Sequence, residues 1–207
     1  MSMPESRGSL LALLTILVGL LLGGAALWLG VQEGAIALLG FGGAGLLQVP
    51  PALSFYGRIQ AGLGNQGLER ERLTWKVVSL LIRFLALGMA MASVSALLGE
   101  RGTQASLGAY VLAGCAVGSL GALWFAKRQL VGVHAALDLD TARTRALLEL
   151  AALLLAGCFL SRWFPWADAA TALVIALRLF LAGHTLAKAS TLQAAACGGC
   201  GSGCGCG

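Results

Sequence analysis

Residues 9–30 have the sequence SLLALLTILVGLLLGGAALWLG, a predominantly apolar stretch that contains no charged side chain. A helix of about 20 apolar residues is long enough to cross the hydrocarbon core of a bilayer, which is roughly 30 Å thick. A helix also satisfies its own backbone hydrogen bonds, which lipid cannot do. We therefore expect this stretch to form a membrane-spanning helix.

The composition of the whole chain agrees with this expectation. Of the 207 residues, 58% are hydrophobic and only 11% are charged, whereas a soluble domain carries about 25% charged residues. So few charged side chains could not cover a water-facing surface. The composition therefore predicts an all-α integral membrane protein and excludes an ordinary soluble domain.

Apolar stretches of similar length recur along the chain, separated by polar segments. They predict six transmembrane helices, each long enough to cross a bilayer. The expected spans are residues 9–30, 34–56, 75–98, 106–125, 142–164 and 166–189.

The second expected span contains residues that interrupt helices. Gly42 and Gly43 lie in its first half, and Pro50 and Pro51 follow in its second half. Proline has no backbone N–H to donate, and its ring clashes with the preceding turn. We therefore expect this span to be kinked or locally unwound.

The spans divide the chain into three parts. Residues 1–8 are expected to be a cytoplasmic N-terminus, and residues 9–190 the transmembrane domain. Residues 191–207 are expected to be a flexible tail rich in Cys and Gly, because such a segment is too small to pack a core. No soluble C-terminal domain is expected.

The basic residues between the spans predict the orientation of the chain. With six crossings, the far side of the membrane carries only Arg101 and Arg162, and by the positive-inside rule both termini are cytoplasmic. We expect the bacterial inner membrane, attraction to its anionic lipids and no nucleic-acid partner. The basic residues on the side of the termini are Arg7, Arg58, Arg70, Arg72, Lys127, Arg128, Arg143, Arg145 and Lys188.

Three segments together resemble the second, fifth and sixth transmembrane helices of the cation diffusion facilitator family, also called cation efflux. They are LGVQEGAIALLGFGGAGL at 29–46, HAALDLDTARTRALLELAALLLAG at 134–157 and PWADAATALVIALRLFLAGHTLAKAS at 165–190. The resemblance covers roughly residues 9–190. It implies a cation-efflux-like bundle of six helices, a homodimer and proton-coupled export of a divalent metal ion.

In that family the transported ion, usually Zn²⁺, is held midway across the membrane by pairs of His and Asp ligands on two helices. Carried over by the resemblance, the second-helix pair falls on Ala44 and Gln48, and the fifth-helix pair on Arg143 and Leu147. This chain departs from the pattern at all four positions, since none is a usual Zn²⁺ ligand. Arg143 would also repel a cation, so the family site is degenerate here.

Ionisable residues within a span are functional hypotheses, because each is unfavourable in lipid. Glu149, Asp168, Arg178 and His184 are candidates for a polar or ion path. The alternatives are structural. Arg178 and Arg83 can pair with Glu149 or with other polar groups, Asp168 can cap a helix start, and His184 can lie at an interface.

The C-terminal segment offers a different kind of site. Cys197 and Cys200 form a CxxC pair, and Cys204 and Cys206 form a CxC pair. Four thiolates are the ligand number of a structural Zn²⁺ site, and soft sulfur also suits Cu(I), Fe or an iron–sulfur cluster. The close spacing favours transient or shared ligation over a preformed zinc finger. The alternative is an inert or lipid-modified tail.

Two functions from different classes follow. The first is a cation-efflux-like membrane protein that handles a divalent or soft metal ion, with the four-Cys tail capturing or delivering it. The alternative is a non-transporting structural or regulatory subunit that binds another membrane protein. No grouping of Ser, His and Asp, or of Cys and His, indicates an enzyme, and Cys115 and Cys158 are expected to be buried apolar residues.

Overall fold

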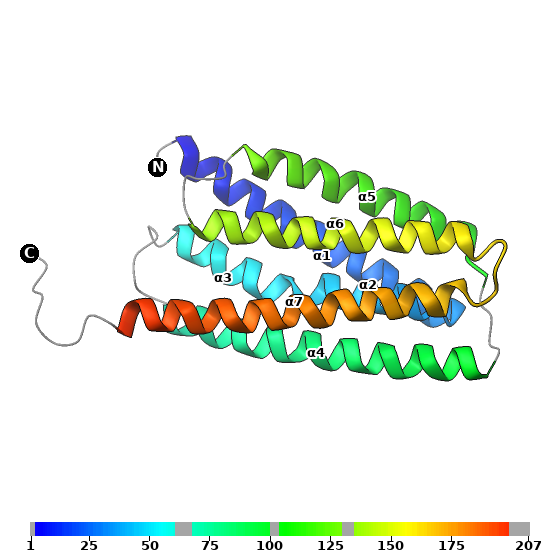
Figure 1. Ribbon diagram of the computed structural model, residues 1–207. Coiled ribbons are helices and arrows are strands. Elements are labelled where there is room, and N and C mark those ends of the chain that lie inside the picture. The colour runs from blue at the N-terminus through cyan, green and yellow to red at the C-terminus, as the bar shows by residue number, and fades with distance from the viewer. Residues whose placement is uncertain (1–2, 61–67, 100–103, 130–134, 199–207) are drawn as a thin grey trace, which may run out of the picture.

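The computed structural model describes residues 3–60, 68–99, 104–129 and 135–198. Every regular element in these ranges is a helix, as expected for an all-α protein. The helices run side by side along one long axis as a bundle (Figure 1). They are α1 (Met3–Glu33), α2 (Ile36–Leu47), α3 (Val49–Gln60), α4 (Leu68–Leu98), α5 (Leu107–Arg128), α6 (Ala135–Leu160) and α7 (Ala167–Gly198).

The start of α1 and the end of α7 lie at the same end of the bundle (Figure 1). We call this end the termini side and the opposite end the far side. The far side holds the ends of α1, α4 and α6 and the starts of α2, α5 and α7. The termini side holds the ends of α3 and α5 and the starts of α4 and α6. The chain therefore crosses the bundle six times, with α2 and α3 together making one crossing.

The expected interruption of the second span is confirmed. Helix α2 ends at Leu47, Gln48 is its C-cap residue, and α3 begins at Val49. Because Pro50 and Pro51 have no backbone N–H, the carbonyl groups four residues earlier lose their helical donors. At the break, the Gln48 N–H donates to the carbonyl of Gly45, three residues earlier, at 3.3 Å.

The helices extend further toward the termini side than the sequence predicts, and α4, α6 and α7 extend the most. Helix α6 begins at Ala135, inside the segment expected to be a loop, and α7 continues past residue 189 to Gly198. The added part of α7 ends in the run Leu192–Gln193–Ala194–Ala195–Ala196, and these residue types have high helix propensity. The backbone of Cys197 therefore lies on a helix and not in an extended tail.

In the described part of the chain, five helical stretches are long and apolar enough to cross a membrane. Helix α6, the expected fifth span, is not among them, because Arg143, Arg145 and Glu149 interrupt its apolar sequence. The five stretches are Leu10–Glu33, Ile36–Ser54, Leu73–Leu98, Leu107–Arg128 and Ala167–Ala187.

Small side chains lie inside the bundle and many large apolar ones lie on its surface. Ala26, Ala113 and Ala172 are fully buried, whereas Leu21 and Met91 are largely exposed. Small residues at helix contacts let helices approach closely where lipid, not water, surrounds them. This distribution is typical of membrane bundles.

The contact between α1 and α2 depends on glycine. A Cβ atom at Gly42 would lie 2.8 Å from the carbonyl oxygen of Gly23 and 2.8 Å from the amide nitrogen of Leu27. No side chain fits at such distances without moving the backbone. Glycine at position 42 therefore sets the separation of the two helices.

Candidate functional site

A cavity of about 420 Å³ lies between α2, α4, α6 and α7. Ala44 and Gln48 face it from the second span, and Arg143 and Leu147 face it from α6. The four positions that the resemblance selects thus line one cavity, although about a hundred residues of sequence separate the two pairs. The other lining residues are Ile82, Ala142, Ala146, Glu149, Leu150, Arg178, Leu179, Leu181, Ala182, Thr185 and Leu186.

The lining is mainly aliphatic, with a few polar groups. Two arginines, Arg143 and Arg178, and one carboxylate, Glu149, are the charged groups among the described residues that line it. A Zn²⁺ ion takes about four N, O or S ligands. Within the ranges that the structure describes, no group of three or more His, Cys, Asp or Glu side chains is placed to hold a metal ion.

Glu149 is shared between two arginines. Its Oε1 lies 3.3 Å from the Nε of Arg145, one turn earlier on α6, and its Oε2 lies 3.9 Å from the Nη1 of Arg178 on α7. The second contact is an ion pair that is too long for a hydrogen bond. The structural alternative for Arg178, pairing with Glu149, is therefore what the structure shows.

Arg143 is held against the wall of the cavity by an aromatic ring. Its guanidinium carbon lies 4.0 Å from the ring centroid of Trp75, a buried residue of α4. A guanidinium over an indole face is a favourable cation–π contact. The cation at this position is consequently a fixed part of the cavity.

Arg83 and His184 lie near the cavity but are not among its lining residues. Arg83 donates from Nη2 to the carbonyl oxygen of Gly183 at 3.3 Å, which joins α4 to α7. It therefore contacts a backbone group rather than Glu149. The His184 side chain is exposed on the surface of α7.

Asp168 lies on the far side, away from Glu149 and Arg178. Its Oδ2 accepts a hydrogen bond of 3.0 Å from the backbone N–H of Ile36, the first residue of α2. The expected capping role is thus found at the start of α2. Asp168 also lines a separate small cavity of about 20 Å³ beside Glu33 and Cys158. The residues of the expected ion path do not line one cavity.

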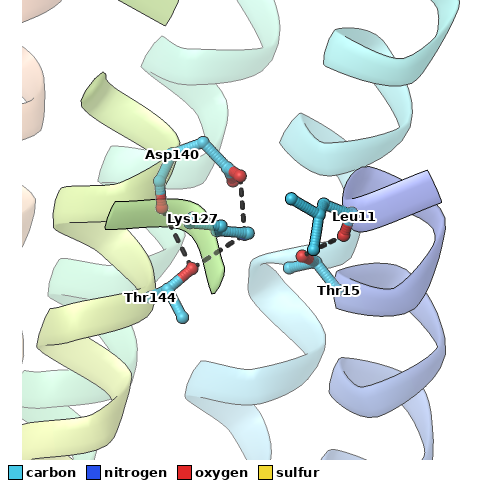
Figure 2. Close-up of polar contacts among 5 residues, drawn as sticks. All are labelled: Leu11, Thr15, Lys127, Asp140 and Thr144. Carbon is cyan, nitrogen blue, oxygen red and sulfur yellow. Dashed lines mark hydrogen bonds and ion pairs between the residues drawn. The ribbon is translucent and has the colours of Figure 1, made fainter. Parts of the chain in front are cut away.

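A buried ion pair on the termini side was not predicted. The Lys127 side chain is only 2% exposed, and its Nζ lies 2.6 Å from Oδ2 of Asp140. Nζ also donates to Oγ1 of Thr144 at 2.9 Å, and this hydroxyl donates to the Asp140 carbonyl at 3.0 Å. Figure 2 shows the three residues converging from α5 and α6, beside Thr15 of α1. The cluster ties α5 to α6.

One sequence signal could have found this cluster. Asp140 and Thr144 are four residues apart, so both side chains lie on one face of α6. The sequence places Lys127 only among the basic residues of a loop, and nothing local indicates that it turns inward. The pairing depends on the packing of α5 against α6.

The cysteines divide into three groups. Cys158 is buried, as expected, whereas Cys115 is exposed on the surface of α5, so its expected burial is wrong. The helical rotation that packs Leu112, Ala113 and Ala116 inward turns Cys115 outward. The predicted metal site lies outside the described residues at Cys200, Cys204 and Cys206, and only the backbone of Cys197 is described.

In comparisons with known proteins, no protein-family model and no curated protein matches this chain. The resemblance to the cation diffusion facilitator family therefore stays a prediction from the sequence. In its described residues, the structure provides an all-helical bundle with five apolar helices and a central, mainly aliphatic cavity that contains two arginines.

Proposed function

We propose that this chain is an integral membrane protein with a cation-efflux-like bundle that handles a divalent or soft metal ion through its C-terminal thiols. In this proposal the central cavity is not the metal site. Five apolar helices and the outward-facing leucines support the membrane placement.

The convergence of Ala44, Gln48, Arg143 and Leu147 on one cavity is the observation that carries the proposal. These positions come from matching two short segments to the second and fifth helices of the resembling family. In this bundle the two pairs face a common space between α2 and α6. Their convergence supports a related helix arrangement.

The charges of the cavity argue against a metal ion inside it. A divalent cation would lie close to Arg143 and Arg178, and Glu149 is already shared by two arginines. Like charges repel strongly where water is scarce. Four soft thiols at Cys197, Cys200, Cys204 and Cys206 are a better donor set for Zn²⁺ or Cu(I).

Metal content tests this proposal. We expect the full chain, purified in detergent and loaded with Zn²⁺ or Cu(I), to retain metal, and a chain lacking residues 197–207 to retain none. Replacing all four tail cysteines by Ser should have the same effect as the deletion. The matched control replaces Cys115 and Cys158 by Ser and should keep the metal. Metal that remains after the tail is removed would contradict the proposal.

A second function, a non-transporting subunit that binds another membrane protein, is favoured by Arg143 and Arg178. A cavity that repels cations offers no path for them. In proteoliposomes we then expect no Zn²⁺ flux above that of empty vesicles. Flux that survives tail deletion but falls on Glu149→Ala or Asp168→Asn would establish transport and exclude this function.

A further inference from the structure

Positive charge exceeds negative charge around the central cavity. Among the described residues that line the cavity, Arg143 and Arg178 carry two positive charges and Glu149 carries one negative charge. Glu149 contacts Arg145 and Arg178, whereas Arg143 lies over Trp75. The described lining residues therefore carry a net positive charge of one.

Arg178 is the group most available to a ligand. Its side chain is 59% exposed, and its contact with Glu149 at 3.9 Å is too long for a hydrogen bond. A guanidinium carries five N–H donors in a planar fork, which matches the oxygens of a carboxylate or phosphate. Arg178 lies near the middle of the candidate span Ala167–Ala187. A cation there requires a counter-charge or water.

The cavity opens between α6 and α7. Ala142 on α6 and Arg178, Leu181 and Thr185 on α7 line the cavity and are also exposed on the surface of the bundle. Ala44 and Leu147 are buried and form its floor. Figure 1 shows α6 and α7 joined on the far side. The opening faces sideways, where a bilayer would lie.

The rest of the lining suits an apolar chain. Ile82, Leu150, Leu179 and Leu186 contribute aliphatic surface next to the arginines. The volume of about 420 Å³ lies within the range of about 300–1,000 Å³ that small-molecule sites occupy. A ligand that satisfies both surfaces carries an oxyanion at one end and an apolar body at the other.

We propose that the cavity binds the oxyanion of an amphiphile, a phosphate or carboxylate group, between Arg178 and Arg143, with its apolar part against the aliphatic lining. The ligand enters from the side, through the opening between α6 and α7. The inference rests on the membrane placement proposed above but not on metal binding by the tail.

The test is a binding titration with the full chain in a neutral detergent. The probes are dioleoyl phosphatidylglycerol, an anionic phospholipid, dioleoyl phosphatidylcholine, which has no net charge, and inorganic phosphate. Native mass spectrometry or the shift in unfolding temperature measures binding. We expect saturable binding of phosphatidylglycerol that exceeds that of phosphatidylcholine. If inorganic phosphate competes with phosphatidylglycerol, the oxyanion alone is sufficient for binding. If it does not compete, the ligand is the phospholipid and not free phosphate.

Variants that remove one charge test whether the cavity binds an anion or a cation. Arg178→Gln should weaken binding about tenfold, the effect of losing one charge-assisted hydrogen bond. Glu149→Gln removes the competing carboxylate and should strengthen anion binding, whereas a cation site would lose affinity. The matched control is Arg162→Gln, an exposed arginine outside the cavity lining, which should leave binding unchanged. Because Arg178 is exposed, its substitution leaves the packed core intact.

Three outcomes would overturn the inference: equal binding of the two phospholipids, weaker anion binding by Glu149→Gln, or equal effects of Arg178→Gln and Arg162→Gln. A concentration-dependent dimer that Arg178→Gln abolishes, without any effect of lipid, would also overturn it, because a second copy would then occupy the opening. The chain lacking residues 197–207 should bind lipid unchanged. This result separates a failure of the inference from a failure of the metal proposal.

Discussion

Lys127 is a charged residue that the fold has enclosed. Its ammonium group lies 2.6 Å from Asp140 and donates to Thr144, and its side chain is almost inaccessible. Removing one partner of such a pair leaves the other charge buried without compensation. The pair therefore makes the contact between α5 and α6 specific, because any other alignment of the two helices would separate Lys127 from Asp140 and leave a buried charge without a partner.

Asp140→Asn should lower the free energy of unfolding by about 3–5 kcal/mol, because Lys127 then stays buried without a counter-ion. Chemical denaturation in detergent, followed by circular dichroism, measures this change. Arg128→Gln, at the exposed neighbour of Lys127, is the control and should have little effect. The double variant Lys127→Met with Asp140→Leu should recover most of the loss. A double variant as unstable as Asp140→Asn would contradict the ion-pair explanation.

Asp168 should matter for stability through its oxygen atom rather than its charge alone. Asp168→Ala removes the acceptor for the Ile36 N–H, and we expect a loss of about 1 kcal/mol, typical of a helix cap. Asp168→Asn keeps an acceptor oxygen and should lose less. The comparison uses the same denaturation measurement. Equal losses in the two variants would indicate that the negative charge at the α2 N-terminus is the essential part.

At the scale of helices, the packing of α1 against α2 is set by the absence of side chains. The backbone of each helix approaches the other at Gly23 and Gly42. Dispersion contacts between such close surfaces stabilise helix pairs where no hydrophobic effect acts between them. This contact holds the first half of the interrupted span, and therefore the side of the cavity that carries Ala44.

Gly42→Ala should destabilise the bundle by about 1–3 kcal/mol, because the new methyl group would overlap the Gly23 carbonyl. Gly24→Ala is the matched control, since a Cβ atom there meets nothing within 4 Å. Alanine also has the higher helix propensity, so the control should be neutral or slightly stabilising. Thermal unfolding of both variants in detergent makes the comparison. Equal unfolding temperatures would show that the helices do not depend on this approach.

For the molecule as a whole, the membrane placement can be tested at Cys115. This thiol is exposed on the surface of α5 within the candidate span Leu107–Arg128. If lipid surrounds the bundle, a water-soluble maleimide should not label Cys115 in intact or detergent-permeabilised vesicles, and should label it after denaturation. Arg162→Cys, in a chain without other cysteines, is the control and should react in vesicles opened to the reagent. Fast labelling of native Cys115 would contradict the placement.

The helices and the broken second span follow from local sequence, because apolar length and Pro50 and Pro51 act within a few residues. The partners of charged residues do not follow from local sequence. Asp168 caps α2, which lies about 130 positions earlier, and Lys127 finds Asp140 only when α5 packs on α6. The resemblance predicted the four positions that line the cavity. It did not predict that Arg178 lies beside them, because this depends on how α7 packs against α6.

The interruption at Gln48 also gives the cavity an internal polarity. Helix α2 stops there, so the partial negative charge of its C-terminal carbonyl groups is left in the middle of the bundle. Pro50 and Pro51 supply no N–H groups to the carbonyls four residues earlier, but α3 begins at Val49, and the Ala52 N–H donates to the Gln48 carbonyl at 3.3 Å. Gln48, at this break, lines the cavity, while the α6–α7 opening carries Arg178. A head group in the proposed site would therefore meet Arg178 from α7, Arg143 from α6 and the polar break of the second span at Gln48.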